Sequence, residues 1–418
     1  MLFRIKINFK IISFLLFLFI LQISVSAQNN IFKDSTFTPG SIYYGDNNFT
    51  IYYAGNMPLI LSAPHGGSQA PAEIPDRTYG STDNDLRTKE MAQYLRQEIF
   101  NLTGKYPHVI INDLRRIKMD ANRDSVEAAQ GNESAIKAWQ EYQSFILSSE
   151  DKVNADYSKG LYIDLHGHGH SIQRIELGYL LSASELNKSN IELNTDTYIN
   201  KSSIKNLVST NVNSLSFIDL LRGQNSLGGY LESAGLSAVP SPNNTSPENN
   251  PYFSGGYCTE MYGSVYGGAI DGIQMEHNRI GIRDSDSNVR TYAKTLAGIL
   301  LEFLKYHYNL DFITDVDENE PLVSGYQLFQ NYPNPFNPTT TISYTIPYVE
   351  TQHAASLHYV TLKIYDVIGK EISTLVNEQK SSGKYTVLFD ATSLPSGLYF
   401  YQLIADRFQQ TKKMLLIK

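Results

Sequence analysis

Apolar and polar positions alternate along the first three quarters of the chain in a pattern that predicts strands followed by helices. Short apolar runs bounded by glycine or polar residues predict buried strands at residues 49–53, 59–63, 109–111, 160–166, 175–181 and 269–276. The pair Gly55-Asn56 between the first two runs is typical of a turn, so these two runs are predicted to form a β-hairpin.

Longer stretches repeat apolar residues at helical spacing, and they occupy residues 85–104, about 134–153 and 287–306. Gly104 is expected to end the first of these helices. Strands that alternate with helices predict an α/β fold with a sheet of mixed or parallel order. Residues 222–268 are rich in Gly, Ser, Pro and Asn, which predicts long loops over a site, either ordered or mobile.

The pattern changes after residue 312. Residues 313–325 are acidic and contain Pro321 and Gly325, which predicts a linker. Beyond it, alternating runs predict strands at 341–346, 360–365, 383–387 and 397–401. Short strands at this spacing predict a small all-β, immunoglobulin-like sandwich.

The first 27 residues are typical of a secretory signal peptide. Basic residues precede the apolar run 11–23, and Val25-Ser26-Ala27 has the small-x-small pattern of a cleavage site. A membrane anchor is the alternative, but the run is short for a bilayer span. We therefore expect an exported protein.

The composition of the chain limits its possible binding partners and its possible cysteine chemistry. The 418 residues carry a net charge of −8, which argues against nucleic acid as the main partner. The single cysteine, Cys258, excludes an intrachain disulfide and a multi-cysteine metal site. We expect Cys258 to be a buried apolar residue and not a nucleophile.

Polar residues that can bind a metal or transfer a proton stand where predicted strands end or helices begin. They are His65, Asp85, Asp164, His166 and Glu276. Asp164 and His166 are two apart on one strand, so their side chains point to the same face. Two histidines and one carboxylate are a common zinc set, and a further carboxylate can act as a general base. Spacing alone does not force this set, because the residues are far apart in sequence.

The C-terminal segment carries a specific set of motifs, listed here in order: Gln330-Asn331-Tyr332-Pro333-Asn334-Pro335-Phe336-Asn337-Pro338, Ile364-Tyr365-Asp366, Ser396-Gly397-Leu398-Tyr399 and Lys412-Lys413-Met414-Leu415-Leu416-Ile417-Lys418. Residues 326–418 resemble the type A sorting domain of the type IX secretion system of Gram-negative bacteria. The resemblance implies contact with that machinery and a secreted or cell-surface protein. A carbohydrate- or protein-binding β-module is the alternative.

A second set of motifs runs through residues 58–306, in the order Ser62-Ala63-Pro64-His65-Gly66-Gly67, Asp85, Arg116, Asp120-Ala121-Asn122-Arg123, Asp164-Leu165-His166-Gly167, Tyr252-Phe253-Ser254-Gly255-Gly256 and Ile273-Gln274-Met275-Glu276. These motifs resemble the N-formylglutamate amidohydrolase family. That family is similar in fold to zinc carboxypeptidases, which implies a mixed sheet flanked by helices. The expected order is a signal peptide at 1–27, a catalytic domain at 28–312, a linker at 313–325 and the sorting domain at 326–418.

The resemblance also implies metal ligands. His65 and His166 would bind zinc, and Asp85 would be the carboxylate ligand. Asp83 and Asp76 remain alternatives to Asp85, because Ser68 stands at the position where carboxypeptidases carry their carboxylate.

The remaining implied roles concern the reaction and the substrate. Glu276 would be the general base, and Arg116 would polarise the scissile carbonyl. Asn122 and Arg123 would clamp a substrate carboxylate. Asp164 would orient His166.

Each of these residues also has a purely structural interpretation. Glu276 could pair with Arg279 or Arg283, and Arg123 with Asp120 or Asp124. The sequence favours a supporting or solvent-facing position for three nearby residues, His168, His170 and Glu176.

One departure from the family concerns substrate choice. Members usually carry an Arg-His pair shortly after the Gly-Gly of the sixth motif, whereas this chain has Glu260-Met261. The main hypothesis is an exported zinc amidohydrolase that cleaves an amide bond of an N-acyl amino acid or peptide-like substrate bearing a free carboxylate. A surface binding protein on an inactive hydrolase scaffold and a zinc carboxypeptidase are the alternatives.

Overall fold

The computed structural model describes residues 30–33, 35–313, 326–347, 358–380, 383–406 and 408–418. The chain divides into two compact units, Met1–Ile313 and Thr314–Lys418. The predicted signal peptide and all of the predicted linker after residue 313 lie outside the described residues. Within the described parts, none of the helices has the length and apolar character needed to cross a bilayer.

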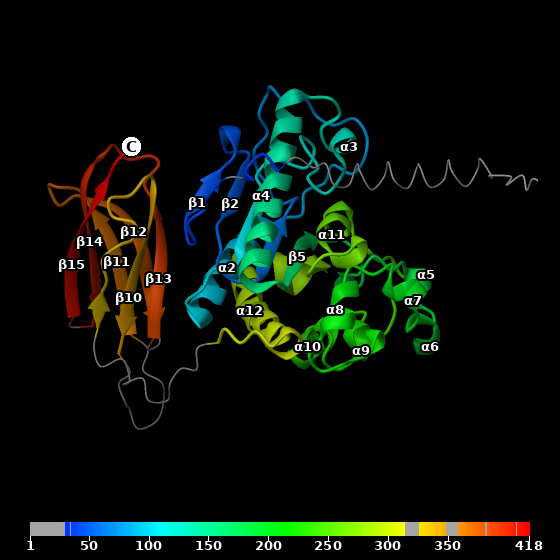
Figure 1. Cartoon of the computed structure of the whole chain (residues 1–418). Coiled ribbons are helices and arrows are strands. Elements are labelled where there is room, and N and C mark those ends of the chain that lie inside the picture. Colours follow the sequence, from blue (N-terminus) through cyan, green and yellow to red (C-terminus); the bar gives the residue numbers. More distant parts are fainter. Residues whose placement is uncertain (1–29, 34, 314–325, 348–357, 381–382, 407) are drawn as a thin grey trace, which may run out of the picture. The chain divides into compact units, whose positions relative to one another are not determined.

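The first unit is built on one eight-stranded sheet in the order β1-β2-β4-β3-β5-β8-β6-β7 (Figure 1). The strands are β1 Ile42–Tyr44, β2 Thr50–Tyr53, β3 Leu59–Ala63, β4 His108–Asn112, β5 Gly160–Gly167, β6 Ile175–Gly178, β7 Ala238–Val239 and β8 Ile270–His277. The central strands β4, β3, β5 and β8 are parallel to one another, whereas β2 and β6 join them antiparallel. The sheet is therefore mixed, as predicted.

The predicted hairpin of β2 and β3 is wrong, because β4 lies between them in the sheet. The connection that contains Gly55-Asn56 docks on the segment leading into β4. Asn56 N donates to the Tyr106 carbonyl at 2.9 Å, and Tyr106 N donates to Asn56 Oδ1 at 2.8 Å. These bonds let the chain cross over β4 instead of turning back on itself.

Three long helices cover the two faces of the sheet (Figure 1): α2 Thr88–Thr103, α4 Glu133–Tyr157 and α12 Asp286–Tyr308. Helices α2 and α12 share one apolar core with the sheet, and α4 packs into a second core with Tyr52, Ile60 and Tyr162 of the opposite face. Burial of this kind is the main stabilising term, since truncating one such core leucine to alanine costs about 2–5 kcal/mol. The predicted α/β fold with helices on both faces is confirmed.

Helix α2 shows how local conformation sets an element's bounds. It begins at Thr88, three residues later than predicted, because Arg87 has a left-handed backbone with φ 65°. Gly104 ends the helix in the same left-handed region, also with φ 65°, and its N–H donates to the Phe100 carbonyl. The displaced start leaves Asp85 outside the helix, where its side chain is available to the site.

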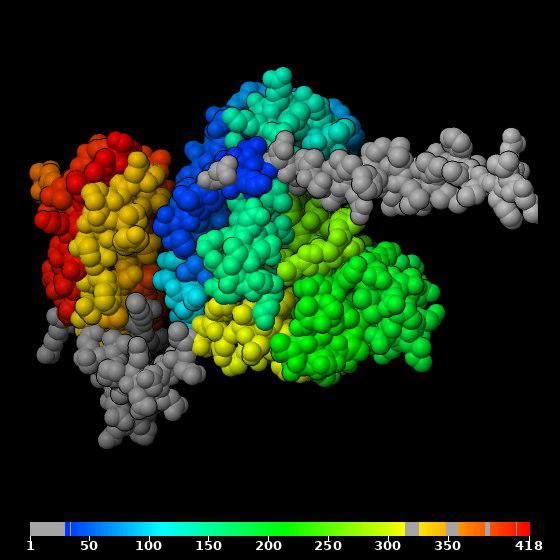
Figure 2. Space-filling model, in the orientation of Figure 1, coloured from blue at the N-terminus to red at the C-terminus, as the bar shows by residue number. Residues whose placement is uncertain are grey.

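The stretch between β6 and β8 forms short helices, and the last two lie within residues 222–268, where the sequence predicted long loops. They are α5 Ala183–Leu186, α6 Asn190–Leu193, α7 Asp196–Ile199, α8 Lys205–Thr210, α9 Phe217–Arg222, α10 Leu227–Ser233 and α11 Tyr257–Tyr262. Three of them begin with a serine capping box, which satisfies their first backbone N–H groups. Figure 2 shows most of this segment in green, gathered on one side of the first unit. The remaining helical pieces are α3 Ser125–Ala129, η1 Asp46–Asn48, η2 Ser264–Tyr266 and η3 Arg279–Arg283.

The second unit consists of two antiparallel sheets with the orders β13-β10-β9 and β12-β11-β14-β15. Its strands are β9 Gln327–Leu328, β10 Thr339–Ile346, β11 His358–Tyr365, β12 Glu371–Lys380, β13 Gly383–Asp390, β14 Gly397–Ala405 and β15 Phe408–Leu416. Inward side chains of both sheets, such as Tyr344, Leu362 and Leu403, form one core. The predicted all-β sandwich is confirmed.

Candidate metal centre

The candidate site lies where three parallel strands end. His65 follows β3, His166 stands near the end of β5, and Glu276 stands near the end of β8. His166 and Glu276 are direct neighbours in the β5–β8 register. Carboxyl ends of parallel strands meet at one edge of the sheet, which explains why residues so far apart in sequence come together.

The histidines converge on one carboxylate oxygen. Asp85 Oδ2 lies 3.3 Å from His65 Nδ1 and 3.1 Å from His166 Nδ1, and it also accepts the Gly167 N–H at 3.1 Å. One donor atom from each of His65, Asp85 and His166 lies within 4.8 Å of the others, and all three residues are buried. The three expected metal ligands therefore share one place.

The other ring nitrogen of each histidine faces a second buried carboxylate. His65 Nε2 lies 2.6 Å from Asp120 Oδ1, and His166 Nε2 lies 2.8 Å from Asp164 Oδ2. The Asp164 carboxylate in turn accepts the Ser62 hydroxyl at 2.5 Å. Carboxylates behind histidine rings fix the ring orientation and raise the basicity of the nitrogen that would bind a metal.

Charges at the site follow from this arrangement. Burial alone would raise the pKa of Asp85, but hydrogen bonds with His166 and His65 hold it well below the ordinary value. Burial would lower the pKa of His166, yet the charge and hydrogen bond of Asp164 raise it well above normal. The donors thus form a compact, charge-rich set at the sheet edge.

Glu276 lies beside the histidine pair in a row of polar residues across three strands. It is next to His166 on β5 and opposite Glu176 on β6. Gln274 Nε2 donates to its Oε1 at 3.0 Å. Burial, with the nearby charge of Asp85 and Glu176, raises the pKa of Glu276 to about 8, although His166 opposes the shift. A carboxyl group with that pKa exchanges protons near neutral pH.

Arg283 does not pair with Glu276. Its guanidinium donates to three backbone carbonyls, those of His277 at 3.1 Å, Leu86 at 2.7 Å and His168 at 3.0 Å. It therefore joins the ends of β5 and β8 to the Asp85 loop. Only glycine fits at position 167, since an added Cβ would lie 2.1 Å from the Arg283 Cζ.

A cavity of about 430 Å³ opens over the site, and its wall includes Asp85, Gly167 and three arginines, Arg116, Arg279 and Arg283. Arg116 Nε donates to Asp120 Oδ2 at 2.9 Å. The cavity is therefore lined by cations next to the ligand set.

The two alternative carboxylates lie away from the histidines. Asp83 is exposed on the cavity wall. Asp76 is exposed and pairs with Lys118 at 2.8 Å. Among the described carboxylates, Asp85 is the one that groups with His65 and His166.

The expected substrate clamp has other partners. Asn122 is buried, with its Nδ2 3.2 Å from His166 Nε2 and its Oδ1 accepting the Cys258 N–H at 2.7 Å. Arg123 Nε donates to Glu127 at 3.2 Å, four residues along, and not to Asp120 or Asp124. Asp124 caps α3 instead.

A second group of potential metal ligands begins two residues after His166 in the sequence. His168, His170 and Glu176 each offer a donor atom within 4.8 Å of the others. His170 Nδ1 lies 2.9 Å from Glu176 Oε1, and Phe253 stacks on the His170 ring with centroids 4.9 Å apart. His168 and His170 line the same cavity as Asp85.

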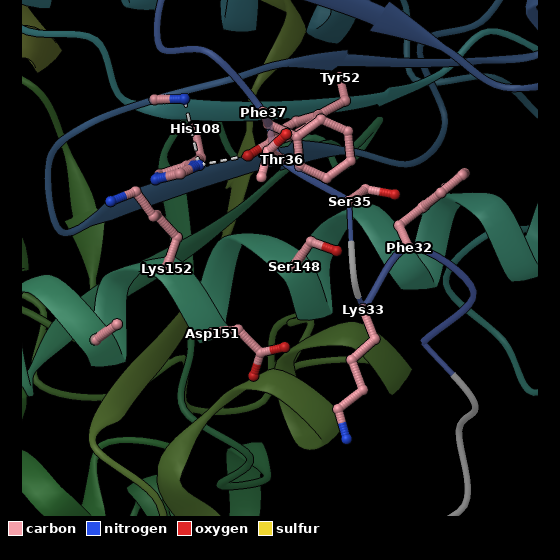
Figure 3. A pocket seen from close by; sticks show the side chains of 12 residues that line it. Phe32, Lys33, Ser35, Thr36, Phe37, Tyr52, His108, Ser148, Asp151 and Lys152 are labelled. Atoms are coloured by element: carbon pink, nitrogen blue, oxygen red, sulfur yellow. Dashed lines mark hydrogen bonds between the residues drawn. The ribbon is translucent and has the colours of Figure 1, made fainter.

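Another cavity, of about 310 Å³, lies over α4 at a distant edge of the same unit (Figure 3). Tyr52 and His108 stand on its wall, and the Tyr52 hydroxyl lies 2.8 Å from His108 Nδ1. Burial lowers the pKa of His108 to about 3. This histidine has a hydroxyl as its side-chain partner and is held neutral.

Two further expectations concern Cys258 and Glu260. Cys258 is buried, and burial raises the pKa of its thiol well above normal, which argues against a nucleophile. Glu260 is exposed on α11 and accepts a hydrogen bond from Tyr266.

Sequence reasoning missed the role of Asp120. It was considered only as a partner for Arg123, whereas it supports the ring of His65. Its signal was its place at the head of the Asp120-Ala121-Asn122-Arg123 motif, two residues before the expected clamp. Two residues of the motif contact the histidine rings, Asp120 at His65 and Asn122 at His166.

Comparison with known families identifies the tail. Residues 330–418 match the secretion system C-terminal sorting domain. The predicted resemblance of the tail is therefore confirmed, and the domain indicates secretion or a cell-surface location together with contact to the type IX secretion machinery. No curated protein matches the chain.

Solved structures with distant similarity include the following three. An N-formylglutamate amidohydrolase from Ralstonia eutropha JMP134 is 12% identical over 65% of this chain and 99% of its own, with a TM-score of 0.40. PorZ, a surface component of the type IX secretion system of Porphyromonas gingivalis, is 18% identical over 24% of this chain and 13% of its own, with a TM-score of 0.15. A conjugative transposon lipoprotein from Bacteroides eggerthii DSM 20697 is 7% identical over 22% of this chain and 95% of its own, with a TM-score of 0.16. Likenesses this distant carry no inference about function.

Proposed function

We propose that the first unit is a zinc-dependent amidohydrolase that acts outside the cell on an amide bond near a free carboxylate. One observation carries the proposal. His65 and His166 share Asp85 Oδ2 on one ring nitrogen, and each has a buried carboxylate, Asp120 or Asp164, on the other.

The donor set fits zinc. Two imidazole nitrogens and one carboxylate oxygen are the protein ligands of many catalytic zinc sites, which leave a position for water or substrate. Carboxylates behind the rings are the usual support for such ligands. When bound by His65, Asp85 and His166, zinc would supply a water molecule of lowered pKa and a Lewis acid for a carbonyl oxygen.

Glu276 supplies the proton transfer in this proposal. Its carboxylate takes a proton from the attacking water as the oxygen adds to the amide carbon. It then gives that proton to the amide nitrogen as the carbon–nitrogen bond breaks, so that an amine and a carboxylic acid leave. Burial raises the pKa of Glu276 above that of an exposed carboxyl group, which favours a group that can both take up and return a proton.

The cationic wall of the cavity supports an anionic substrate. Arg116 and Arg279 lie on this wall beside Asp85. Arginine recognises carboxylates through paired N–H groups and stabilises developing negative charge. We propose that Arg116 polarises the scissile carbonyl. Asn122 and Arg123 would bind the substrate carboxylate together, and for this the Arg123 side chain must first leave Glu127.

Metal analysis and turnover test the proposal together. The purified full chain is expected to contain zinc and to release an amine from at least one member of a panel of N-acyl amino acids, blocked dipeptides and γ-glutamyl peptides. Glu276→Gln is expected to lower turnover at least about a thousandfold and to retain zinc, because it removes the base but no ligand. Glu371→Gln is the matched control and is expected to leave turnover unchanged, since Glu371 lies in the second unit and pairs with Lys363 there.

Three results would count against the proposal. Zinc-free protein, or turnover that survives Glu276→Gln, contradicts the mechanism. Binding of panel compounds with no turnover supports a binding protein instead. Removal of C-terminal residues from N-blocked peptides, with no deacylation, supports a carboxypeptidase.

A further inference from the structure

We propose a second divalent-cation site, of the zinc class, formed by His168, His170 and Glu176 beside the first. One donor atom from each residue lies within 4.8 Å of the others. Two imidazoles and a carboxylate favour Zn²⁺, Co²⁺ or Ni²⁺ over the oxygen-seeking Ca²⁺ and Mg²⁺. This proposal goes beyond the proposed function, which needs only the first site.

His168 has the hydrogen bonding of a histidine ligand. Its Nε2 donates to the Arg174 carbonyl at 2.8 Å, which fixes the ring and the tautomer. A backbone carbonyl in this position is a common partner of metal-binding histidines. The remaining nitrogen, Nδ1, accepts the His170 N–H at 3.1 Å, and a metal ion on Nδ1 would take the place of this hydrogen bond.

His170 and Glu176 are already in contact. His170 Nδ1 lies 2.9 Å from Glu176 Oε1, so a proton is shared between a nitrogen and an oxygen that both bind zinc. A cation that takes the place of this proton bonds to both atoms and releases one proton to solvent. Glu176 stays oriented in the process, because its Oε2 accepts the Phe253 N–H at 2.9 Å.

The carboxylates give an independent reason for a cation here. Glu176 and Glu276 are directly opposite each other on the antiparallel strands β6 and β8, and both are buried. Like charges in directly opposed positions of a sheet repel each other. Arg174 offsets part of this charge, but its Nε is 3.9 Å from Glu176 Oε1 and has no hydrogen-bond partner among the described residues. A divalent ion on Glu176 would remove the remaining repulsion when both carboxylates are ionised.

Strand geometry relates the two sites. His166, Glu276 and Glu176 occupy one row across β5, β8 and β6. Adjacent strands are about 4.8 Å apart, which puts His166 and Glu176 about 10 Å apart along the row, with Glu276 between them. His168 and His170 also line the cavity that holds Asp85. Substrate in this cavity would therefore meet both sites.

Zinc stoichiometry of the full chain tests the proposal. Protein stripped with a chelator is dialysed against ZnCl₂, and bound zinc is measured by mass spectrometry. The wild type is expected to bind two equivalents, and His170→Gln, Glu176→Gln and Asp85→Asn one each. Asp83→Asn, a cavity-wall carboxylate outside both clusters, is the matched control and is expected to keep two.

Folding of each variant is checked by fluorescence of Trp139, the only tryptophan of the chain. His170 is the most exposed of the three ligands, with 20% of its side chain accessible, so its replacement is the least disruptive. Cobalt substitution gives a second readout, in which the visible absorption of bound Co²⁺ is expected to fall by about half in His170→Gln, in keeping with the loss of one of two cobalt–imidazole sites.

The outcomes separate this proposal from the proposed function. One equivalent in the wild type, lost in Asp85→Asn and kept in His170→Gln, overturns the second site and leaves the first intact. One equivalent lost only in His170→Gln and Glu176→Gln supports the second site and contradicts the first. Two equivalents that survive both His170→Gln and Glu176→Gln place the extra zinc elsewhere and overturn the proposal.

Discussion

The two histidine clusters at the end of the central strands differ in what lies behind their rings. In the first, His65 and His166 have Asp120 and Asp164 as partners of Nε2. In the second, the Nε2 of His168 faces only a backbone carbonyl. A negatively charged partner raises the basicity of the opposite ring nitrogen more than a neutral one does. The first cluster should therefore bind a metal more tightly and govern activity. The second cluster should bind its metal less tightly and lose it under milder conditions.

The largest expected effect comes from removing a histidine of the first cluster, and the matching change in the second cluster is the comparison. His166→Asn is expected to lower amide hydrolysis at least about a thousandfold, because it removes a ligand of the proposed zinc. His168→Asn is expected to lower it about tenfold or less, a loss that kcat/KM measurements on the same substrate can resolve. Equal losses in both variants would show that the clusters act as one unit.

A smaller effect is expected when the supporting carboxylates are neutralised. Asp120→Asn and Asp164→Asn should weaken zinc binding by about 10–100-fold, because the histidine rings lose basicity and orientation. Competition with a zinc-binding dye gives the affinity. Asp113→Asn is the matched control. The Asp113 carboxylate pairs with Lys89 Nζ at a distance of 2.7 Å and is not a partner of either histidine ring. If the control loses as much affinity as the two variants, the rings are not tuned by these carboxylates.

His108 provides a third kind of histidine, buried with a tyrosine hydroxyl and no carboxylate. Its pKa is lowered to about 3, so the folded protein stays neutral at this ring while the unfolded chain takes up a proton below about pH 6.5. Stability is therefore complete above that pH and falls as the pH drops towards 3. From pH 7 to pH 5 this group should remove about 2 kcal/mol.

Urea unfolding followed by Trp139 fluorescence measures this pH effect in the first unit. His108→Gln is expected to reduce the loss between pH 7 and pH 5 by about 2 kcal/mol, because the variant has no ring to protonate. The comparison uses the difference between the two pH values, so a general destabilisation of the variant does not affect it. An unchanged difference would mean that His108 does not titrate between the folded and unfolded states.

The smallest effect is expected at Arg123. Its side chain is one-third exposed and paired with Glu127, so Arg123→Ala should raise KM by only about threefold. Arg116→Ala should lower kcat/KM by about 10–100-fold, because Arg116 lines the cavity and binds Asp120. A tenfold or larger increase of KM in Arg123→Ala would restore the carboxylate clamp that the sequence motif implies.

The sequence revealed those site residues that stand at strand ends, since apolar runs end visibly at His65, His166 and Glu276. The order of the strands in the sheet could not be predicted from the sequence. It depends on where the connection through Asn56 docks, and that contact joins residues 50 apart. The support of His65 by Asp120 spans 55 residues, so the motif that contains Asp120 did not reveal which residue it contacts. The partner of Arg123 was nearer, since Glu127 follows at helical spacing, but the five residues of α3 were too few to show a period.

Arg283 has a consequence for the choice of ion. Its guanidinium ties the Leu86, His168 and His277 carbonyls together, so backbone contacts set the spacing of the ligand-bearing segments before any ion arrives. If these segments hold a metal as proposed, such a frame would favour ions of one radius, because widening it would break those bonds. Ions that need six to eight oxygen ligands at longer distances, such as Ca²⁺, would be rejected by size as well as by ligand chemistry.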